Sequence, residues 1–143
     1  MQTTSSRTHD PDRARAFFED KLAFTTGPVE LDHMLKAGEY IIVVDVRDAE
    51  DFAKGHIPRA LSLPRERWDS LEGMSRDKTY IFCCYTQTCH LSAQACVKFV
   101  SRGYPVMELE GGFAAWKAAE LDIEREPVNC LKRAGERLLH RRH

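Results

Sequence analysis

The sequence predicts an α/β fold in which a central parallel sheet is covered by helices on both faces. Apolar, β-branched segments alternate along the chain with segments whose apolar residues recur at helical spacing. The run at 40–46 (YIIVVDV) is continuous, which is typical of a strand buried on both faces, whereas 91–101 is amphipathic. Strands that alternate with helices form parallel sheets. A length of 143 residues suits one such domain.

Two helices are predicted at the start of the chain. Asp10 and Pro11 suit the N-cap and the first position of a helix over 12–22 whose apolar residues share one face. We expect this helix to pack as an N-terminal extension formed by residues 1–26. A second, short helix is predicted over 29–36, because its apolar residues have helical spacing and a glycine follows.

A loop region follows the strand at 40–46. Residues 48–53 are predicted to form a helical turn, and the segment 55–58 (GHIP) indicates a loop before a brief strand at 61–63. The segment 64–71 is expected to be helical.

The second half of the chain repeats the alternation. Strand, helix, strand and helix are predicted at 78–84, 91–101, 106–109 and 112–119. These elements place one domain in residues 27–126. A basic tail follows at 127–143, and we expect it to be helical.

Composition excludes several classes of protein. The chain is 43% hydrophobic and 30% charged, and it has no apolar run long enough for a membrane helix. A net charge of −1 gives no general reason to expect nucleic acid as a partner. The first ten residues lack the apolar stretch of a secretory signal, so we expect a cytoplasmic location. Five cysteines, an odd number, then indicate reduced thiols instead of a disulfide framework.

The clearest chemistry lies in the loop between the strand at 78–84 and the helix at 91–101. Open parallel sheets carry reactive groups beyond the carboxyl ends of their strands, and backbone N–H groups at a helix start favour a thiolate. Successive strand side chains face opposite ways, so Cys83 and Cys84 cannot reach the same pocket, and we expect Cys83 to face the core. The same alternation, and the lack of a C-x-x-C pair, give no reason to expect a metal.

Four motifs resemble those of rhodanese-like sulfurtransferases. They are the cysteine loop at 80–90, the strand end Asp45-Val46-Arg47, and the segments at 55–60 (GHIPRA) and 110–116 (EGGFAAW). The third looks like the family's GHIPGA-type segment, and the fourth looks like its GG-x-x-x-W terminator. They occur in the family's order and spacing between Val29 and Glu126. The resemblance implies a rhodanese-like fold.

The resemblance also implies that Cys84 is the nucleophile. Its thiolate would take the outer sulfur of a donor such as thiosulfate, and the resulting persulfide would pass that sulfur to a small thiol or a protein acceptor. No cofactor is implied. Backbone N–H groups of the active-site loop would hold the anionic sulfur. That loop comprises Tyr85, Thr86, Gln87, Thr88, Cys89 and His90.

Three polar residues are expected to support the site. Asp45 and Arg47 are best interpreted as an ion pair or hydrogen-bond clamp near the loop. His56, within its GHIP segment, is expected to fix a loop by hydrogen bonding instead of acting as a base.

The loop departs from the family pattern in its charge. A typical loop carries glycine and at least one arginine or lysine, which bind an anionic donor, whereas 85–89 contains neither. His90 is the loop-end residue able to become cationic near neutral pH. We therefore hypothesise that the donor is a persulfide on a protein or small thiol, which needs less fixed positive charge than thiosulfate.

Two other functions stay open on the sequence. A non-catalytic or redox-sensing rhodanese module would use Cys84 and Cys89 as its responding thiols, and Cys89 is also the second candidate for the nucleophile. A thiol phosphatase or arsenate reductase needs a C-x5-R loop. Cys84 to His90 has that spacing, but histidine cannot form the paired hydrogen bonds of arginine to a tetrahedral anion. The oligomeric state is not indicated.

Overall fold

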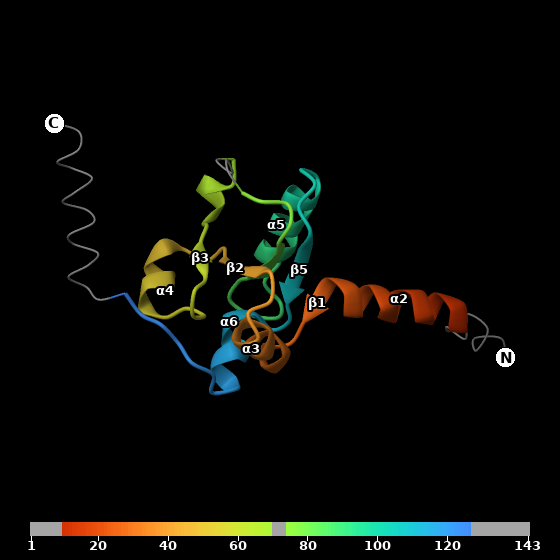
Figure 1. Ribbon diagram of the computed structural model, residues 1–143, viewed down its shortest axis with the longest axis horizontal. Coiled ribbons are helices and arrows are strands. Elements are labelled where there is room, and N and C mark those ends of the chain that lie inside the picture. The colour runs from red at the N-terminus through yellow and green to blue at the C-terminus, as the bar shows by residue number, and fades with distance from the viewer. Residues whose placement is uncertain (1–9, 70–73, 127–143) are drawn as a thin grey trace.

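The fold is an α/β arrangement built on one parallel sheet, in a computed structural model that describes residues 10–69 and 74–126 (Figure 1). Within these residues the sheet has five strands in the order β1-β5-β4-β2-β3, all parallel. The strands are β1 (Thr25–Thr26), β2 (Ile41–Asp45), β3 (Leu61–Ser62), β4 (Thr79–Cys83) and β5 (Val106–Leu109). The predicted fold class is confirmed.

The two longest strands form the centre of the sheet. β2 pairs with β4 along its whole length, from Ile41 beside Thr79 to Asp45 beside Cys83. Both faces of this central pair are covered, which explains why β2 is apolar from Ile41 to Val44 instead of alternating with polar residues. Because the strands are parallel, β2 and β4 end at the same edge of the sheet, where Cys84 follows directly.

Helices cover both faces of the sheet. Figure 1 shows α5 on one side of the strands and α3 and α6 on the other. The helices are α2 (Pro11–Phe24), α3 (Pro28–Lys36), α4 (Ala49–Lys54), α5 (Leu91–Val100) and α6 (Gly112–Ala118), with a short 3-10 helix η1 (Arg65–Arg67).

The sheet separates two hydrophobic clusters. On the α5 face, Phe82 and Cys84 pack with Phe99 of that helix. On the opposite face, Cys83 packs in the cluster that includes Leu31 of α3 and Trp116 of α6. The expected alternation of the two adjacent cysteines is therefore confirmed.

The predicted packing of the N-terminal helix is wrong. The helix itself forms as expected, with Asp10 Oδ1 accepting hydrogen bonds from the N–H groups of Asp12 (3.1 Å) and Arg13 (3.2 Å). However, α2 buries none of its residues, and Phe17 and Leu22 are 61% and 78% exposed. The reason is topological: α2 runs directly into the edge strand β1 and projects away from the sheet (Figure 1).

Two further differences concern element boundaries. β1 was not expected, because two threonines are too short for a recognisable strand pattern, yet they pair with Glu108 and Leu109 of β5. The helix predicted at 64–71 is reduced to η1; its last residues, like the tail at 127–143, lie outside the described ranges. None of the described helices is long and apolar enough to cross a membrane.

The last described residues return to the domain. His56 and Glu124 form an antiparallel bridge with two backbone hydrogen bonds of 2.9 Å. The Trp116 indole N–H donates to the carbonyl of Asp122 (2.8 Å). The segment after α6 is therefore tied to the GHIP loop and to the core.

Candidate active site

The cysteine loop joins the central strand β4 to α5 and is held by the N-terminal end of α6. The N–H groups of Phe113 and Ala114 donate to the carbonyls of Cys84 (2.8 Å) and Tyr85 (3.0 Å). This approach requires glycine at position 112, where φ is +61° and a Cβ would lie 2.7 Å from the Cys84 carbonyl oxygen. Gly112 and the preceding Gly111, called here the glycine pair, thus let the start of α6 lie directly against the loop.

Contacts within the loop make it fold back on itself. The Cys89 N–H donates to the carbonyl of Thr86 (3.2 Å), which closes a turn. The side chain of Gln87 accepts a hydrogen bond from the N–H of Gly111, so the far side of the loop is also tied to the glycine pair. The hydroxyls of Thr86 and Thr88 lie 3.4 Å apart at the exposed tip. The turn brings the two loop cysteines together.

Cys84 is buried between the end of β4 and the first turn of α5. The residue is 1% exposed, and its Sγ lies 3.4 Å from Ser92 Oγ and 3.4 Å from the carbonyl oxygen of Cys89. Ser92 Oγ in turn donates to Glu108 Oε2 (2.7 Å). Burial raises the pKa of the Cys84 thiol, and the contact with Cys89 adds to this, whereas Ser92 acts in the opposite direction.

Cys89 has the opposite character. It is partly buried, and its sulfur interacts with the Cys84 thiol and lies near the N–H groups of Leu91 and Tyr85. Burial alone would raise its pKa, but the Cys84 thiol and the two backbone N–H groups outweigh burial, and the pKa of Cys89 is lowered. Of the two thiols, Cys89 is the more readily ionised.

The other two described cysteines have inert surroundings. Cys83 is fully buried on the opposite face of the sheet, and burial raises its pKa well above the ordinary value. Burial also raises the pKa of Cys96, on α5, to about 12, and its Sγ lies 3.8 Å from the Met107 carbonyl oxygen. Neither thiol is prepared for nucleophilic chemistry.

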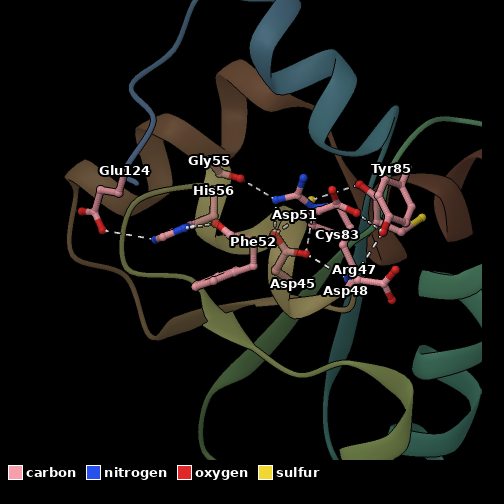
Figure 2. A network of polar contacts seen from close by, with 11 residues as sticks. Asp45, Arg47, Asp48, Asp51, Phe52, Gly55, His56, Cys83, Tyr85 and Glu124 are labelled. Carbon is pink, nitrogen blue, oxygen red and sulfur yellow. Dashed lines mark hydrogen bonds and ion pairs between the residues drawn. The ribbon is translucent and has the colours of Figure 1, made fainter. Parts of the chain in front are cut away.

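Asp45 and Arg47 form the expected clamp at the end of β2 (Figure 2). The Nε–Nη2 edge of the guanidinium binds both carboxylate oxygens, with Nε 3.0 Å from Oδ1 and Nη2 2.8 Å from Oδ2. Nη2 also donates to the Gly55 carbonyl (2.6 Å), and the guanidinium lies 4.1 Å from the centre of the Phe113 ring. Both side chains are buried, so this cation is used to hold the structure next to the loop.

Tyr85 connects the loop to α4. Its hydroxyl donates to Asp51 Oδ2 (2.6 Å) and accepts from the Asp48 N–H (3.2 Å), as Figure 2 shows. Burial and the neighbouring carboxylate raise the pKa of Tyr85 to about 12. The side chain is therefore a neutral support for the loop at ordinary pH.

His56 has the structural contacts that the sequence suggested. Its Nδ1–H donates to the Phe52 carbonyl (2.7 Å), and the ring stacks on the Phe52 ring at 3.7 Å. Its Nε2 lies 3.7 Å from Glu124 Oε2 (Figure 2). His90, by contrast, is exposed at the start of α5, and its side chain does not cap that helix.

Sequence reasoning missed the residues that surround the cysteines. Ser92, Glu108 and Asp51 come from three different elements, and only the fold brings them to the loop. One signal was available: Glu108 is a charged residue inside the otherwise apolar strand VMEL, which indicates a partner on the facing helix.

The fold and this loop define a class of protein: a parallel α/β domain with a cysteine loop between its central strand and a helix, closed by a glycine pair. The chain belongs to the rhodanese-like domain family, whose model matches residues 27–119. The resemblance stated from the four motifs is confirmed.

Relatives at moderate identity carry sulfurtransferase names. The chain is 30% identical over 100 residues to the putative sulfurtransferase YtwF of Bacillus subtilis, a match covering 69% of this chain and 90% of that protein. It is 36% identical over 93 residues to the thiosulfate sulfurtransferase GlpE of Pseudomonas putida, covering 64% and 83%. Among solved structures, the BH2092 protein of Bacillus halodurans has a TM-score of 0.76 at 35% identity, covering 81% of this chain and 87% of that one. These similarities support a sulfurtransferase-like role.

Proposed function

We propose that this chain is a sulfurtransferase that carries sulfane sulfur as a persulfide on Cys84 and passes it to a small thiol or a protein acceptor. The observation that carries the proposal is the place of Cys84. It directly follows the central strand, with its sulfur beside the first turn of α5, in a loop whose carbonyls are bound by α6. Its sulfur also lies against Ser92, which acts against the rise in the Cys84 pKa that burial causes.

The neighbouring thiol differs from Cys84 in how readily it ionises. Cys89 ionises more readily than Cys84, and the two side chains interact directly. Because the thiolate with the lower pKa is the weaker base, the proton of Cys84 passes to the leaving thiolate of the donor and not to Cys89. Burial of Cys84 then protects the persulfide from stray thiols.

The charges around the loop favour a persulfide donor over thiosulfate. The Arg47 guanidinium beside the loop is bound by Asp45, and two carboxylates, Glu108 and Asp51, contact Ser92 and Tyr85. A dianion approaching this loop meets carboxylates and no arginine or lysine in 84–90. A persulfide on a small thiol or on a protein carries less charge at the reacting sulfur and needs less compensation.

The four described cysteines are all free thiols, and reduced thiols are typical of a reducing compartment. The cytoplasm is accordingly the location that goes with this proposal.

The test is a mass measurement after loading. The reduced protein is incubated with glutathione persulfide or with thiosulfate, separated from small molecules and digested. The peptide with Cys84 should gain about 32 Da, faster with glutathione persulfide. Cys84→Ser should abolish the gain, while Cys96→Ala, the matched control on α5, should retain it. Loading that survives in Cys84→Ser would move the carrier to Cys89, and a clear preference for thiosulfate would refute the donor assignment.

A second candidate function is a redox-sensing module, favoured by the direct interaction of the two loop thiols. Such a module would respond to hydrogen peroxide by losing about 2 Da between Cys84 and Cys89, and it would gain no sulfur from either donor.

A further inference from the structure

The loop brings two interacting thiols into one six-residue segment. The Cys89 N–H bond to Thr86 turns the chain back towards Cys84, whose Sγ lies 3.4 Å from the Cys89 carbonyl oxygen. The side chains of the two cysteines also interact directly. Whatever sulfur is bound at one thiol therefore has the other as its immediate neighbour.

The other described thiols cannot serve as that neighbour. Cys83 packs on the opposite face of the sheet, in the cluster with Leu31 and Trp116. Cys96 lies further along α5, where its Sγ contacts the Met107 carbonyl. Among the four cysteines of the described ranges, Cys89 alone is built into the same loop as Cys84.

The two loop thiols have different surroundings. Cys84 is 1% exposed within the α5-face cluster, whereas Cys89 is partly buried at the surface of the loop, with the N–H groups of Tyr85 and Leu91 near its sulfur. These donors lower the pKa of Cys89, so the thiolate that attacks a disulfide-type bond is available beside Cys84.

We infer that Cys89 resolves the persulfide formed on Cys84, so that the chain releases the sulfur as sulfide and is left with a Cys84–Cys89 disulfide. This inference rests on the proposed function. It adds a reductive outcome to sulfur transfer: when no acceptor thiol reaches the loop, the second cysteine takes the acceptor's place.

The step balances within the loop. The Cys89 thiolate attacks Cys84 Sγ, an S–S bond forms between the two cysteines, and the bond from Cys84 Sγ to the outer sulfur breaks. The outer sulfur leaves with the bonding electron pair as hydrosulfide. The sulfane sulfur is thereby reduced, and the two cysteines are oxidised by two electrons. A dithiol reductant from outside must then reduce the disulfide before the next cycle.

The experiment follows a loaded protein without any free thiol or oxygen. Wild type, Cys89→Ser and Cys96→Ala are reduced, loaded anaerobically with glutathione persulfide, desalted and sampled over time for sulfide and for intact and peptide mass. Wild type and Cys96→Ala should each release one sulfide per loaded chain and lose about 2 Da relative to the reduced chain, in a peptide pair linking Cys84 to Cys89. In Cys89→Ser the gain of about 32 Da should persist at least about tenfold longer, until dithiothreitol is added.

Each other outcome decides against the inference in a distinct way. A Cys84 persulfide that lasts equally long in wild type and Cys89→Ser overturns the resolving role and leaves the proposed function intact. Sulfur found on Cys89 of wild type shows attack at the outer sulfur and also overturns it. Failure of both wild type and Cys89→Ser to gain sulfur or release sulfide overturns the proposed function, and the inference with it.

Discussion

Replacing Gly112 with alanine, and comparing it with the same change at Gly38, should show how much of the effect comes from backbone strain and how much from displacement of the cysteine loop. The residue has φ +61°, and an added Cβ would lie 2.7 Å from the Cys84 carbonyl oxygen and 3.0 Å from the Thr86 nitrogen. Gly38, just after α3, has φ +70° and is the matched control, because its Cβ would meet nothing within 4 Å. Both substitutions impose the cost of a left-handed backbone on alanine, about 1–2 kcal/mol.

Gly112→Ala carries a further cost. Ordinary contact begins at 3.4 Å, and the difference from 2.7 Å means that loop and helix must separate by about 0.7 Å. Overpacking of this kind costs about 1–3 kcal/mol. The movement lengthens the bonds from Phe113 and Ala114 to the loop carbonyls. Because a displacement of about 1 Å can cost about 100-fold in rate, loading of the loop should slow by about tenfold or more.

Two assays check this prediction. Urea unfolding, followed by the fluorescence of the buried Trp68 and Trp116, gives the free energy of unfolding, and the mass assay gives the rate of sulfur loading. Gly38→Ala should lose stability but load at the wild-type rate. If Gly112→Ala matched Gly38→Ala in both assays, the contact between the glycine pair and the loop would have no role in shaping the site.

Three other predictions address the site's surroundings. Asp45→Asn should lower the free energy of unfolding by about 3–5 kcal/mol, because it leaves a guanidinium buried without its carboxylate. Glu19→Gln, at an exposed ion pair, should lower it by less than about 0.5 kcal/mol. If urea unfolding gave similar losses of stability for the two variants, the Asp45–Arg47 pair would not act as a buried clamp. Iodoacetamide should modify Cys89 with a pH midpoint below that of an ordinary cysteine thiol, because its pKa is lowered. It should modify Cys96 much more slowly until the protein unfolds, and equal rates in the native protein would contradict the different surroundings. Ser92→Ala removes a hydroxyl that lowers the pKa of the loop nucleophile, so the pH profile of loading should move to higher pH, and an unchanged profile would exclude that role.

Those parts of the fold that depend on local pattern could be predicted from the sequence. β2 and β4 were recognisable because strands covered on both faces are apolar throughout, and the alternation of Cys83 and Cys84 follows from the geometry of any strand. The Asp45–Arg47 pair was also expected, since both residues belong to one short motif.

Features that depend on distant neighbours could not be predicted. Helical periodicity shows that α2 has an apolar face, but not whether another element covers it. Burial of Cys84 and the contact of Ser92 with Glu108 arise only when α5 packs on β5. The different ionisation of Cys84 and Cys89 likewise depends on how the loop turns, which its six residues do not reveal by themselves.

The antiparallel bridge between His56 and Glu124 determines how far the chain must extend to fold. A fragment ending at residue 119, where the match to the family model ends, would lack Glu124 and leave the backbone N–H and carbonyl of the buried His56 without partners. It would also deprive the fully buried Trp116 indole of its acceptor at Asp122. Each such loss costs about 1–3 kcal/mol, a large part of the stability of a domain this size. The shortest fragment that retains these contacts therefore ends no earlier than Glu124, beyond the EGGFAAW motif.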